Sequence, residues 1–442
     1  DNAELSYDKL VLAPGAKAFM PDIPGIDKPH CFTVKSLNDA DNIKSYIAHH
    51  TIRSAVVVGG GFIGIETAEN LHETGIKTFL AEAAPQILPP LDDDMVCQLH
   101  SRLRQKGIEL HLQDGLKEIT DSEVKLNSGK SLPADLVILA LGIRPDTSFL
   151  AQSGVELTEK GLIKTNEYMQ TNIPDIYACG DSVAIKDFVS GKPAMIALAG
   201  PANRQGRLIA DHIAGRAYPY NASQGTGIVK VFDLTAAFTG NNEKQLKANN
   251  IPYEKMLVWS SSHAGYYPNA TPLALKVLYD KDAKILGAQA VGCENIDKII
   301  DVIATVQRLG GTAADLRDAE LCYAPPYSSA KSPVNIIGMA IENVRQKLVN
   351  PYFGTDFSDM FVLDVRPAKN YEAEHIPGAV NIPAAQIRER LNELPKDKPV
   401  LVHCFKGYTS YIICRILMAN GFNNVFSYAG GWQQYKAEFE DK

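Results

Sequence analysis

The sequence has no excess of positive charge, no CxxC pair and no long apolar run. Its 442 residues carry 44 Lys and Arg against 51 Asp and Glu, a net charge of -7, so no broad positive field attracts nucleic acid. No apolar stretch approaches the roughly 20 residues of a membrane-spanning helix, and the N-terminal residues lack the layout of a secretory signal. These absences exclude nucleic acid and membrane from the expected partners and predict a cytoplasmic protein.

The seven cysteines are scattered and odd in number. Neither a disulfide framework nor a structural zinc site fits such spacing, so no metal site is predicted. The chain begins at Asp1 rather than Met, and residues 7–13 already read as a buried strand that enters a turn at Pro14 and Gly15. We therefore expect the chain to be an N-terminally truncated fragment.

The order of apolar strands and amphipathic helices predicts several α/β units. Apolar residues make up 45% of the sequence, enough for roughly three domain cores. Residues 55–145 alternate strands and helices, as open parallel sheets do. Residues 225–335 read as half-buried strands followed by a helix over 295–309, which indicates a separate α+β unit. A linker near 345–357 leads into a last compact unit.

A glycine-rich turn stands between a strand and a helix early in this alternation. The pattern GxGxxG places Gly59 in the tight turn, Gly61 where the backbone approaches a pyrophosphate, and Gly64 where the helix packs on the strand. Glu82 ends the next strand, 18 residues after Gly64, where its carboxylate can accept hydrogen bonds from a ribose. No arginine follows it, so NADH is favoured over NADPH. Glu66, one turn into the helix, is expected either at the surface or facing a flavin and a nicotinamide.

This unit is expected to be inserted into a second nucleotide-binding domain, because a strand and turn over 10–15 precede it. Residues 171–181 would supply the second half of that outer domain, a strand that ends at Gly180 and Asp181. An aspartate there can accept hydrogen bonds from a polyol such as a ribityl chain. Taken alone, Asp181 is equally well explained as a helix cap. The predicted fold class is α/β, with two interleaved doubly wound dinucleotide-binding domains.

Five segments carry a resemblance to a known family. They are GFIGIE (61–66), ANRQGR (202–207), HAGYYP (263–268), LGAQAVG (286–292) and YAPPYSSAKSPVN (323–335). Through them, residues 1–340 resemble the flavoprotein pyridine nucleotide-disulfide oxidoreductases, and within that group the coenzyme A-disulfide reductases. The resemblance implies an incomplete FAD-binding domain over 1–50 and 146–222, an NAD(H)-binding domain over 51–145 and an α+β dimerisation domain over 223–345.

The resemblance also implies FAD and NADH as cofactors, a homodimer, and coenzyme A as part of the substrate. Asn203 and Lys331 would contact coenzyme A, while Tyr323 and one of Tyr266 or Tyr267 would reach the active-site sulfur of the opposite subunit. Without the resemblance, Tyr323 would be an ordinary packed aromatic. The cofactor-binding set is Ala13, Pro14, Gly15, Gly59, Gly61, Ile63, Gly64, Glu66, Glu82, Gly142, Gly180 and Asp181. Such enzymes use one cysteine, and neither that cysteine nor the first glycine-rich βαβ unit is within this sequence.

The C-terminal unit has chemistry of its own. A strand over 361–366 ends in Asp-x-Arg, and EHIPGA follows at 374–379. A second strand runs directly into Cys404 and a helix, so the thiol faces several backbone N–H groups and the positive helix end, which stabilise a bound anion. This placement suits a persulfide carrier. Residues 356–442 resemble a single-domain rhodanese, which has an α/β fold.

The active loop over 404–409 ends in Thr409, where most rhodaneses carry arginine. The grip on an anion must then rest on backbone donors around Gly407, on the Thr409 hydroxyl and on Lys406. We expect poor turnover of thiosulfate, while a neutral or coenzyme-bound persulfide is still handled. The alternative for Cys404 is a buried, inert thiol.

The remaining thiols and a histidine beside the loop have simpler expected roles. Packed thiols are predicted at Cys179, Cys293, Cys322 and Cys414. His403 precedes the loop on a strand and is expected to be a hydrogen-bonded core histidine rather than a base.

Together these observations predict an NADH- and FAD-dependent enzyme that reduces coenzyme A persulfides, polysulfides or coenzyme A disulfides, fused to a rhodanese sulfurtransferase. Cys404 would accept or hand over sulfane sulfur. Two alternatives stay open. One is an NADH oxidase or peroxidase of the same fold, whose cysteine cycles through sulfenic acid. The other is a rhodanese module that only binds sulfane sulfur or a partner.

Overall fold

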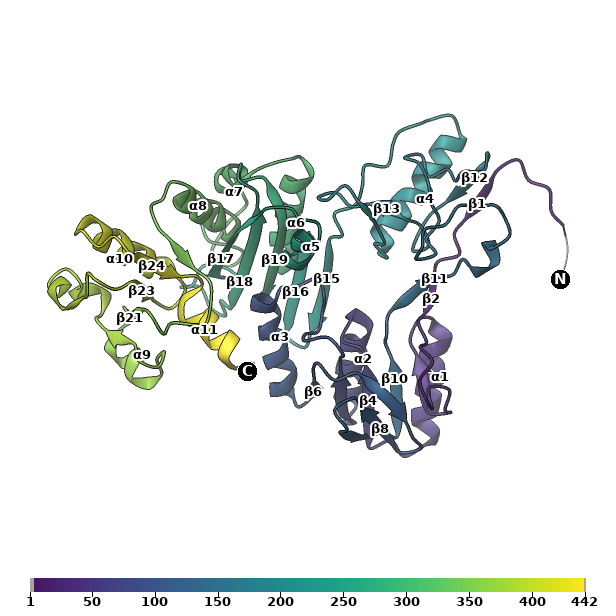
Figure 1. The fold of residues 1–442 in the computed structure, drawn as a ribbon, viewed down its shortest axis with the longest axis horizontal. Coiled ribbons are helices and arrows are strands. Elements are labelled where there is room, and N and C mark those ends of the chain that lie inside the picture. The colour runs from purple at the N-terminus through teal and green to yellow at the C-terminus, as the bar shows by residue number, and fades with distance from the viewer. Residues whose placement is uncertain (1–3, 441–442) are drawn as a thin grey trace. The chain divides into compact units, whose positions relative to one another are not determined.

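The structure, a computed structural model, describes residues 4–440 and divides into two compact units. The first unit comprises Asp1–Pro89 and Leu103–Gly227, and the second comprises Pro90–Arg102 and Ile228–Lys442. Figure 1 follows the chain from purple at the N-terminus to yellow at the C-terminus. The outermost ends of the predicted domains, residues 1–3 and 441–442, lie outside the described part.

The glycine-rich turn belongs to a five-stranded parallel sheet in the first unit. Its strands follow the order β3 (Cys31–Thr33), β10 (Leu136–Leu139), β4 (Ser54–Val58), β5 (Lys77–Ala81) and β6 (Glu109–His111). α2 (Phe62–Glu73) packs on β4 and β5, and β4 is buried over its whole length, as central parallel strands are. The sheet confirms the predicted α/β alternation.

Further elements complete this part of the first unit. α1 (Leu37–His49) lies against β3, and its N-terminus has a capping box formed by Ser36 and Asp39. A three-stranded antiparallel sheet is formed by β7 (Leu116–Ile119), β8 (Glu123–Leu126) and β9 (Ser131–Pro133). Its buried side chains share a core with β4, β5 and β10.

The parallel sheet extends further toward the N-terminus than the predicted boundary at residue 51. β3 pairs in parallel with β10, so residues 31–33 lie in the sheet of the glycine-rich unit and not with the range 1–50 that was assigned to the FAD portion. The strand is three residues long and its side chains are all half-buried, so it leaves no alternating apolar pattern in the sequence.

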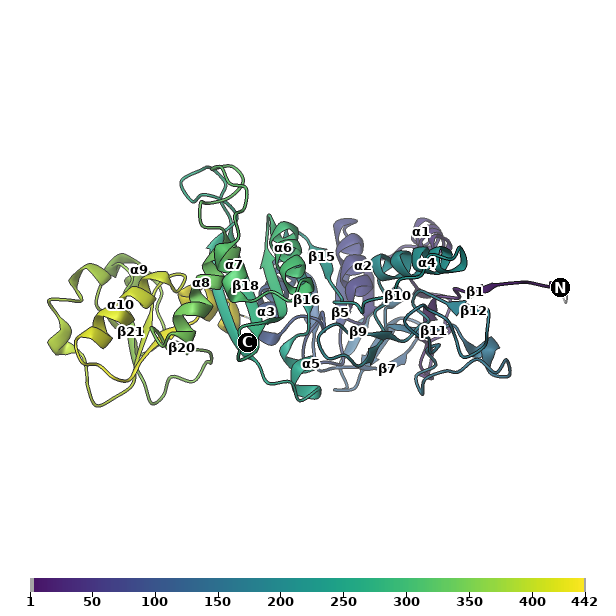
Figure 2. The ribbon, with the colours of Figure 1, turned by 90° about the horizontal axis from the view of Figure 1, so that it is seen from above.

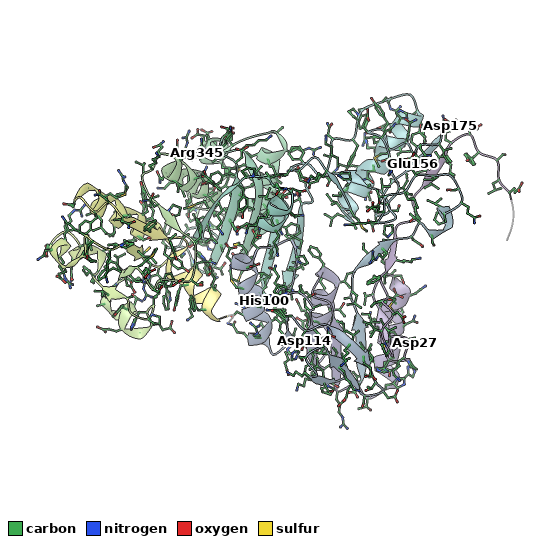
Figure 3. All side chains as sticks on the ribbon, in the orientation of Figure 1. Asp27, His100, Asp114, Glu156, Asp175 and Arg345 are labelled. Carbon is green, nitrogen blue, oxygen red and sulfur yellow. The ribbon has the colours of Figure 1, made fainter. Side chains whose placement is uncertain are left out.

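Two segments far apart in the sequence form the outer part of the first unit. β1 (Leu10–Leu12) pairs in parallel with β12 (Ile176–Ala178), and Lys9 forms an ion pair with Asp175, which Figure 3 labels. This pairing across the inserted sheet confirms the predicted interleaving. The other elements are β2 (Ala16–Ala18) paired with β11 (Ile143–Pro145), β13 (Ile185–Lys186) paired with β14 (Pro193–Ala194), η1 (Ser148–Leu150) and α4 (Ala199–Ile213).

The first strand is shorter and more exposed than predicted. A buried strand was expected over 7–13, but β1 covers three residues and Val11 is 43% exposed. Among the described residues β1 has one neighbouring strand, β12, so its sheet has two strands and little surface on which to bury side chains.

The second unit contains a five-stranded antiparallel sheet. Its strands follow the order β15 (Gly227–Val231), β16 (Leu234–Gly240), β19 (Ile285–Gly292), β18 (Pro272–Tyr279) and β17 (Glu254–Ser261). α6 (Ile296–Arg308), α7 (Ala313–Asp318) and α8 (Pro333–Arg345) lie close together beside it (Figure 2). Apolar residues of α6 and α8 share one core with β18 and β19.

The prediction that these strands are half-buried was wrong for β18 and β19, two of the three interior strands. β19 is buried over its whole length, and β18 is buried except at Pro272. The reason is that both faces are covered. α6 and α8 cover one face, while residues 92–94 at the start of α3 (Asp93–Lys106) contact Lys276 and Gln289 on the other.

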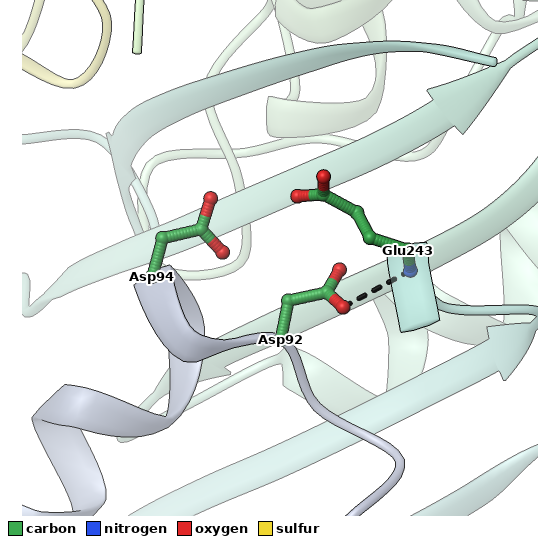
Figure 4. Close-up of side chains that lie close together, drawn as sticks. All are labelled: Asp92, Asp94 and Glu243. Atoms are coloured by element: carbon green, nitrogen blue, oxygen red, sulfur yellow. Dashed lines mark hydrogen bonds between the residues drawn. The ribbon is translucent and has the colours of Figure 1, made fainter. Parts of the chain in front are cut away.

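Lys276 is fully buried in the middle of β18 and is surrounded by three carboxylates. Its Nζ lies 3.0 Å from Asp92, 2.6 Å from Asp94 and 2.5 Å from Glu243. Figure 4 shows the three carboxylates converging, with Asp92 accepting a hydrogen bond from the backbone N–H of Glu243, the first residue of α5 (Glu243–Ala248). Burial opposes the charge, but the three carboxylates together raise the pKa of Lys276 above its usual range.

The carboxylate cluster is therefore an ion-pair centre. Three carboxylates within reach of one another are the donor set of a cation site, but here the lysine ammonium stands among them. Asp92, which is 4% exposed, also accepts a hydrogen bond from Gln289 Nε2 at 2.6 Å. Through these contacts the cluster links α3 and α5 to strands β18 and β19 of the sheet.

Acid should loosen this cluster through Glu243. Burial opposes ionisation, yet Lys276 and Lys255 lower the pKa of Glu243 from 4.5 to about 2. A depressed pKa contributes stability above pH 4.5 that is lost as the pH falls toward 2. We expect Glu243→Gln to remove this part of the acid decline, measured as the free energy of unfolding in denaturant at successive pH values. Glu372→Gln, at an exposed position, is the control, and an acid decline equal in all three proteins would contradict the assignment.

The C-terminal part of the second unit has a five-stranded parallel sheet. Its strands follow the order β20 (Pro351–Tyr352), β24 (Val425–Tyr428), β23 (Val400–His403), β21 (Phe361–Asp364) and β22 (Val380–Asn381). The helices are α9 (Ala368–Ala373), η2 (Ala384–Gln386), η3 (Leu391–Glu393), α10 (Tyr408–Ala419) and α11 (Gly431–Glu440). Because β20 pairs with β24, this domain begins within the expected linker, before residue 356.

Within residues 4–440, no helix combines the length and the hydrophobicity that crossing a membrane requires.

Candidate functional site

The glycine-rich turn has the backbone geometry that its sequence predicts. Gly59 has φ of 109°, and a side chain there would lie 2.2 Å from the carbonyl oxygen of Ala140. A Cβ on Gly64 would lie 1.9 Å from the carbonyl oxygen of Gly59, so only glycine lets α2 approach β4 this closely. At Gly61, the N-cap residue just before α2, no described atom lies within 4 Å of such a Cβ. The open space beside the N-terminus of α2 fits a pyrophosphate.

Glu82 lies at the end of β5, beside this turn. Its Oε2 accepts a hydrogen bond from the N–H of Gly60 at 2.6 Å, and its Oε1 accepts one from Ala84 at 2.8 Å. These bonds hold the carboxylate at the edge of the turn, where a ribose of a bound dinucleotide would lie. Ile63 and Glu66 are exposed on the first turns of α2, and Gly142 has φ of 96° just after β10.

We expect Glu82→Ala to weaken NADH binding about ten-fold, because it removes the carboxyl group that would accept hydrogen bonds from the ribose hydroxyls. The dissociation constant can be measured by titrating NADH fluorescence. Glu73→Ala, at the far, exposed end of α2, is the control. Unchanged affinity in Glu82→Ala would show that this carboxylate does not bind the dinucleotide.

The expected FAD-binding residues lie at the carboxyl ends of β1 and β12. Ala13 and Pro14 follow β1, and Gly15 has φ of 70°. Gly180, with φ of 84°, donates its N–H to Gln205 Oε1 at 2.7 Å, and no described atom would meet a Cβ there within 4 Å. Asp181 lies next to it, with Lys35 Nζ 3.6 Å from its carboxylate. Adjacent strand ends with open glycines fit the edge of a flavin dinucleotide site.

The residues expected to contact coenzyme A, or the active site of the opposite subunit, are mostly exposed. In the first unit, Asn203 lies on α4 and donates to the carbonyl of Ala199 at 2.8 Å. In the second unit, Tyr266 is 85% exposed and Tyr323 is 62% exposed, so Tyr323 is not the packed aromatic that the alternative predicts for it. Tyr267 is 42% exposed, Lys331 is also exposed, and all four are accessible to a partner or ligand.

Cys404 lies at the turn between β23 and α10. Its sulfur accepts a hydrogen bond from the N–H of Gly407 at 3.2 Å and lies 3.7 Å from Ser410 Oγ. Gly407 has φ of 101°, a conformation that favours glycine and that turns the chain into α10. Cys404 is 5% exposed, so the residue is largely buried beneath the loop.

The two side chains expected to grip an anion beside Cys404 differ in their contacts. Lys406 is half-buried, and its Nζ donates to Ser261 Oγ at 2.9 Å and to the carbonyl of Ser260 at 3.4 Å. Burial lowers the pKa of Lys406. Thr409 lies in the first turn of α10, half-buried beside the loop.

The Asp-x-Arg segment forms a buried ion pair behind the loop. Arg366 is 2% exposed and pairs with Asp364 at 2.6 Å, with its guanidinium 4.3 Å from the ring centroid of Trp432. His403 is fully buried, which confirms the expected core position, and its Nε2 lies 3.5 Å from a carboxylate oxygen of Asp364. Among the described residues neither ring nitrogen has a partner of hydrogen-bond geometry, so the expected hydrogen bond is not formed. Burial lowers the pKa of His403 to about 4, which keeps the ring neutral.

The other thiols for which packing was predicted are buried or half-buried, except Cys322. Burial raises the pKa of Cys179, of Cys293 and, most strongly, of the fully buried Cys414. Cys322 was expected to be packed as well, but it is exposed, because the segment between α7 and α8 that carries it has little structure of its own.

A cavity of about 450 Å³ lies within the second unit, between the antiparallel sheet and the C-terminal domain. Lys331 lines it together with Lys406, Gly407 and Tyr408 of the Cys404 loop. Most of the lining is apolar, and no described residue that lines it is acidic. The arrangement can hold a ligand that has an apolar body and an anionic group.

Several residues around this cavity were not predicted. Ser261 and His263, at the end of β17, line it. Gln434 of α11 does not line the cavity but accepts a hydrogen bond from Trp259, which does. The segment over 263–268 carried part of the family resemblance, but a role was predicted only for Tyr266 and Tyr267 and none for His263. The contact between Ser261 and Lys406 joins residues 145 positions apart, and no local pattern marks it.

Three family models match the chain. They are the pyridine nucleotide-disulphide oxidoreductase model over residues 1–206, the corresponding dimerisation domain over 226–333 and the rhodanese-like domain over 352–438. A coenzyme A disulfide reductase from Staphylococcus epidermidis is 36% identical over 337 residues, which cover 76% of this chain and 76% of that protein.

Solved structures extend the similarity to the C-terminal domain. Reduced Bacillus anthracis CoADR-RHD is 42% identical with a TM-score of 0.94, covering 98% of this chain and 80% of that one. A NAD-dependent persulfide reductase from A. fulgidus is 34% identical with a TM-score of 0.94, covering 99% and 81%. A water-forming NADH oxidase from Lactobacillus brevis is less similar, 27% identical with a TM-score of 0.74, covering 78% and 77%. The chain thus belongs to the FAD-dependent pyridine nucleotide-disulphide oxidoreductases, and it carries their dimerisation domain and a C-terminal rhodanese-like domain.

Proposed function

We propose that the protein uses NADH and FAD to reduce coenzyme A persulfides, polysulfides or coenzyme A disulfides, and that its rhodanese-like domain transfers sulfane sulfur. Three relatives that are 34–42% identical to this chain support the assignment, because they are named as coenzyme A disulfide or persulfide reductases. The observation that carries it is the cavity lined by both Lys331 and the Cys404 loop. A coenzyme A-bound sulfur group in that cavity would lie beside the sulfurtransferase thiol.

The residues of this chain would bind and orient the two cofactors and the substrate. FAD and NADH, when bound, supply the hydride chemistry. The open backbone at Gly61 would receive the NADH pyrophosphate and Glu82 the ribose, while Gly180 and Asp181 would border the flavin. Lys331 would attract the anionic part of coenzyme A.

Cys404 would act as the nucleophile of the sulfur transfer. Its thiolate attacks the terminal sulfur of a coenzyme A persulfide, the S–S bond of the donor breaks, and coenzyme A leaves as a thiolate that takes up a proton. The product is a Cys404 persulfide, so no net oxidant or reductant is needed. The N–H of Gly407, which already donates to the sulfur, would stabilise the negative charge.

Steady-state turnover of the full-length protein tests the reductase assignment. Under argon, we expect NADH oxidation with coenzyme A persulfide to release one sulfide for each NADH. With oxygen or peroxide as the acceptor, NADH oxidation should be slower by at least about ten-fold, a difference of about 1.4 kcal/mol in activation free energy. Faster turnover with oxygen or peroxide than with the persulfide would support the oxidase or peroxidase alternative and overturn the proposal.

We infer that the protein works as a cytoplasmic homodimer. The dimerisation domain supports the dimer. The exposed side chains of Tyr266 and Tyr323 support it too, because both would be able to contact the active site of the opposite subunit. All seven cysteines are unpaired, which is typical of reducing compartments. Light scattering that gives twice the chain mass would support the dimer, and a monomeric mass at working concentration would oppose it.

A further inference from the structure

The Cys404 loop is fastened to the dimerisation domain at two points on one strand. We propose that the side chains of Trp259 and Ser261, at the end of β17, are positioning groups of the sulfurtransferase site: Ser261 holds the loop through Lys406, and Trp259 holds it through Gln434 and α11. This inference rests on the proposed sulfur transfer at Cys404. It adds that the rhodanese-like domain is not autonomous and borrows part of its active-site geometry from the neighbouring domain.

The first fastening is made by Lys406. Its side chain leaves the loop and donates to Ser261 Oγ at 2.9 Å and to the carbonyl of Ser260 at 3.4 Å, both at the end of β17. Lys406 follows Cys404 by two residues and precedes Gly407, whose N–H contacts the sulfur. A constraint on Lys406 therefore acts on the backbone that carries this donor. The Lys406 side chain therefore forms hydrogen bonds with the dimerisation domain and not with the loop itself.

The second fastening begins at Trp259. The indole N–H donates to Gln434 Oε1 at 2.9 Å, and Gln434 Nε2 donates to the carbonyl of Asp94 at 2.7 Å. Gln434 is 2% exposed, so both bonds lie in the interior, where a lost partner is costly. The carboxylate of Asp94 is itself paired with Lys276, so Gln434 joins α11 to the buried ion-pair cluster.

The first turn of α11 is hydrogen-bonded to the Cys404 loop, so the position of the helix affects the position of the loop. The backbone N–H of Trp432 donates to the carbonyl of Cys404 at 2.8 Å, and that of Gln433 donates to the carbonyl of Phe405 at 3.1 Å. These N–H groups belong to the helix N-terminus and have no partner within the helix. They therefore hold the two loop carbonyls, and a shift of α11 would move the two peptide groups that directly follow the Cα of Cys404.

The backbone between β17 and the Cys404 loop is closely packed. A Cβ on Gly430 would lie 2.8 Å from Trp259 Cδ1 and 2.8 Å from Leu257 Cδ2. A Cβ on Gly431 would lie 2.5 Å from the carbonyl oxygen of Cys404. The backbone at the start of α11 is thus packed closely against β17 at Gly430 and against the active loop at Gly431, so the position of the strand constrains that of the loop.

Ser261→Ala tests the first fastening from outside the rhodanese-like domain. It removes the hydroxyl that accepts from Lys406 and leaves every residue of the loop unchanged. We expect the rate of sulfur loading on Cys404 from coenzyme A persulfide to fall about three- to ten-fold, the size expected for one hydrogen bond. Ser260→Ala is the matched control, because Lys406 contacts only the backbone carbonyl of Ser260. Ser261→Thr keeps the hydroxyl and should restore the rate.

A second readout separates this inference from the function on which it rests. The alkylation rate of Cys404 by iodoacetamide, followed by mass spectrometry, reports the loop geometry whether or not sulfur is transferred. If the unsubstituted protein takes up no sulfur, the sulfurtransferase proposal fails. If it takes up sulfur and Ser261→Ala matches Ser260→Ala in both loading and alkylation, the fastening proposal fails.

Gln434→Met gives an independent test of the second fastening. Methionine is close to glutamine in volume but cannot accept from Trp259 or donate to Asp94. We expect sulfur loading and Cys404 alkylation to change by about three- to ten-fold, while Gln433→Met, on the same helix turn, changes neither. Folding of each variant is checked by its thermal midpoint. Equal rates in the Gln434 and Gln433 variants would contradict the role given to Gln434.

Discussion

Replacing Cys404 by serine is expected to lower sulfane-sulfur transfer at least about a thousand-fold, because the nucleophile itself is removed. A serine hydroxyl is not ionised at neutral pH and forms no persulfide. The fold should be kept, since the Gly407 N–H can donate to an oxygen at this position as it does to the sulfur. The measurement is cyanolysis: protein loaded with a persulfide donor is treated with cyanide, and thiocyanate is counted per chain.

Cys322→Ser is the control for this experiment. Cys322 is an exposed free thiol that lies outside the rhodanese-like domain, so it tests whether any accessible thiol yields thiocyanate. We expect this variant to match the unsubstituted protein. Substantial thiocyanate from Cys404→Ser would place the sulfur carrier elsewhere. A loaded parent protein that releases no thiocyanate would favour the alternative of a module that binds sulfane sulfur without transferring it.

Lys276→Met is expected to lower the free energy of unfolding by about 3–5 kcal/mol, the usual cost of removing one partner from a buried ion pair. The loss leaves Asp92, Asp94 and Glu243 close together without the ammonium that lies among them. Burial raises the pKa of Asp92, so protonation of this carboxylate would recover part of the loss. Denaturant unfolding at neutral pH measures the effect.

Lys247→Met is the matched control for this substitution. Lys247 approaches the same carboxylate, with its Nζ 3.8 Å from Glu243, but its side chain is 68% exposed. A surface pair of this kind contributes little, so we expect a change of less than about 0.5 kcal/mol. Similar losses in the two variants would contradict the view that burial, rather than charge pairing alone, makes Lys276 important.

The local motifs could be interpreted correctly from the sequence because each depends on neighbouring residues. Gly59 and Gly64 are required by backbone contacts within a few residues or with one adjacent strand, and their spacing is enough to predict the turn. Gly407 is similar, since its positive φ directs the chain from β23 into α10. The interleaving of two domains was also predictable, because the glycine-rich unit begins too late to be the first element of a domain.

The buried polar contacts could not be predicted in the same way. Lys276 in a strand reads as a solvent-facing residue, because Asp94, one of its partners, lies 182 positions away along the chain. Gln434 contacts Trp259, 175 positions away, and reads as an ordinary helical surface residue. Lys406 was assigned to the anion site from its position in the loop, but its partner, Ser261, belongs to another domain. Such pairs depend on how domains pack together, and a periodic pattern carries no signal of that.

The central claim is that the flavin reduces coenzyme A-bound sulfane sulfur, with Cys404 as a sulfur carrier. The most direct measurement is stopped-flow reoxidation of the flavin in the full-length protein, reduced anaerobically with NADH and mixed with coenzyme A persulfide, with and without Cys404→Ser. We expect rapid reoxidation and sulfide release in the unsubstituted protein. Its loss in Cys404→Ser would make the thiol an obligatory relay, and its persistence would make the transferase auxiliary. No reoxidation by the persulfide in either protein, with rapid reoxidation by oxygen or peroxide, would contradict the account.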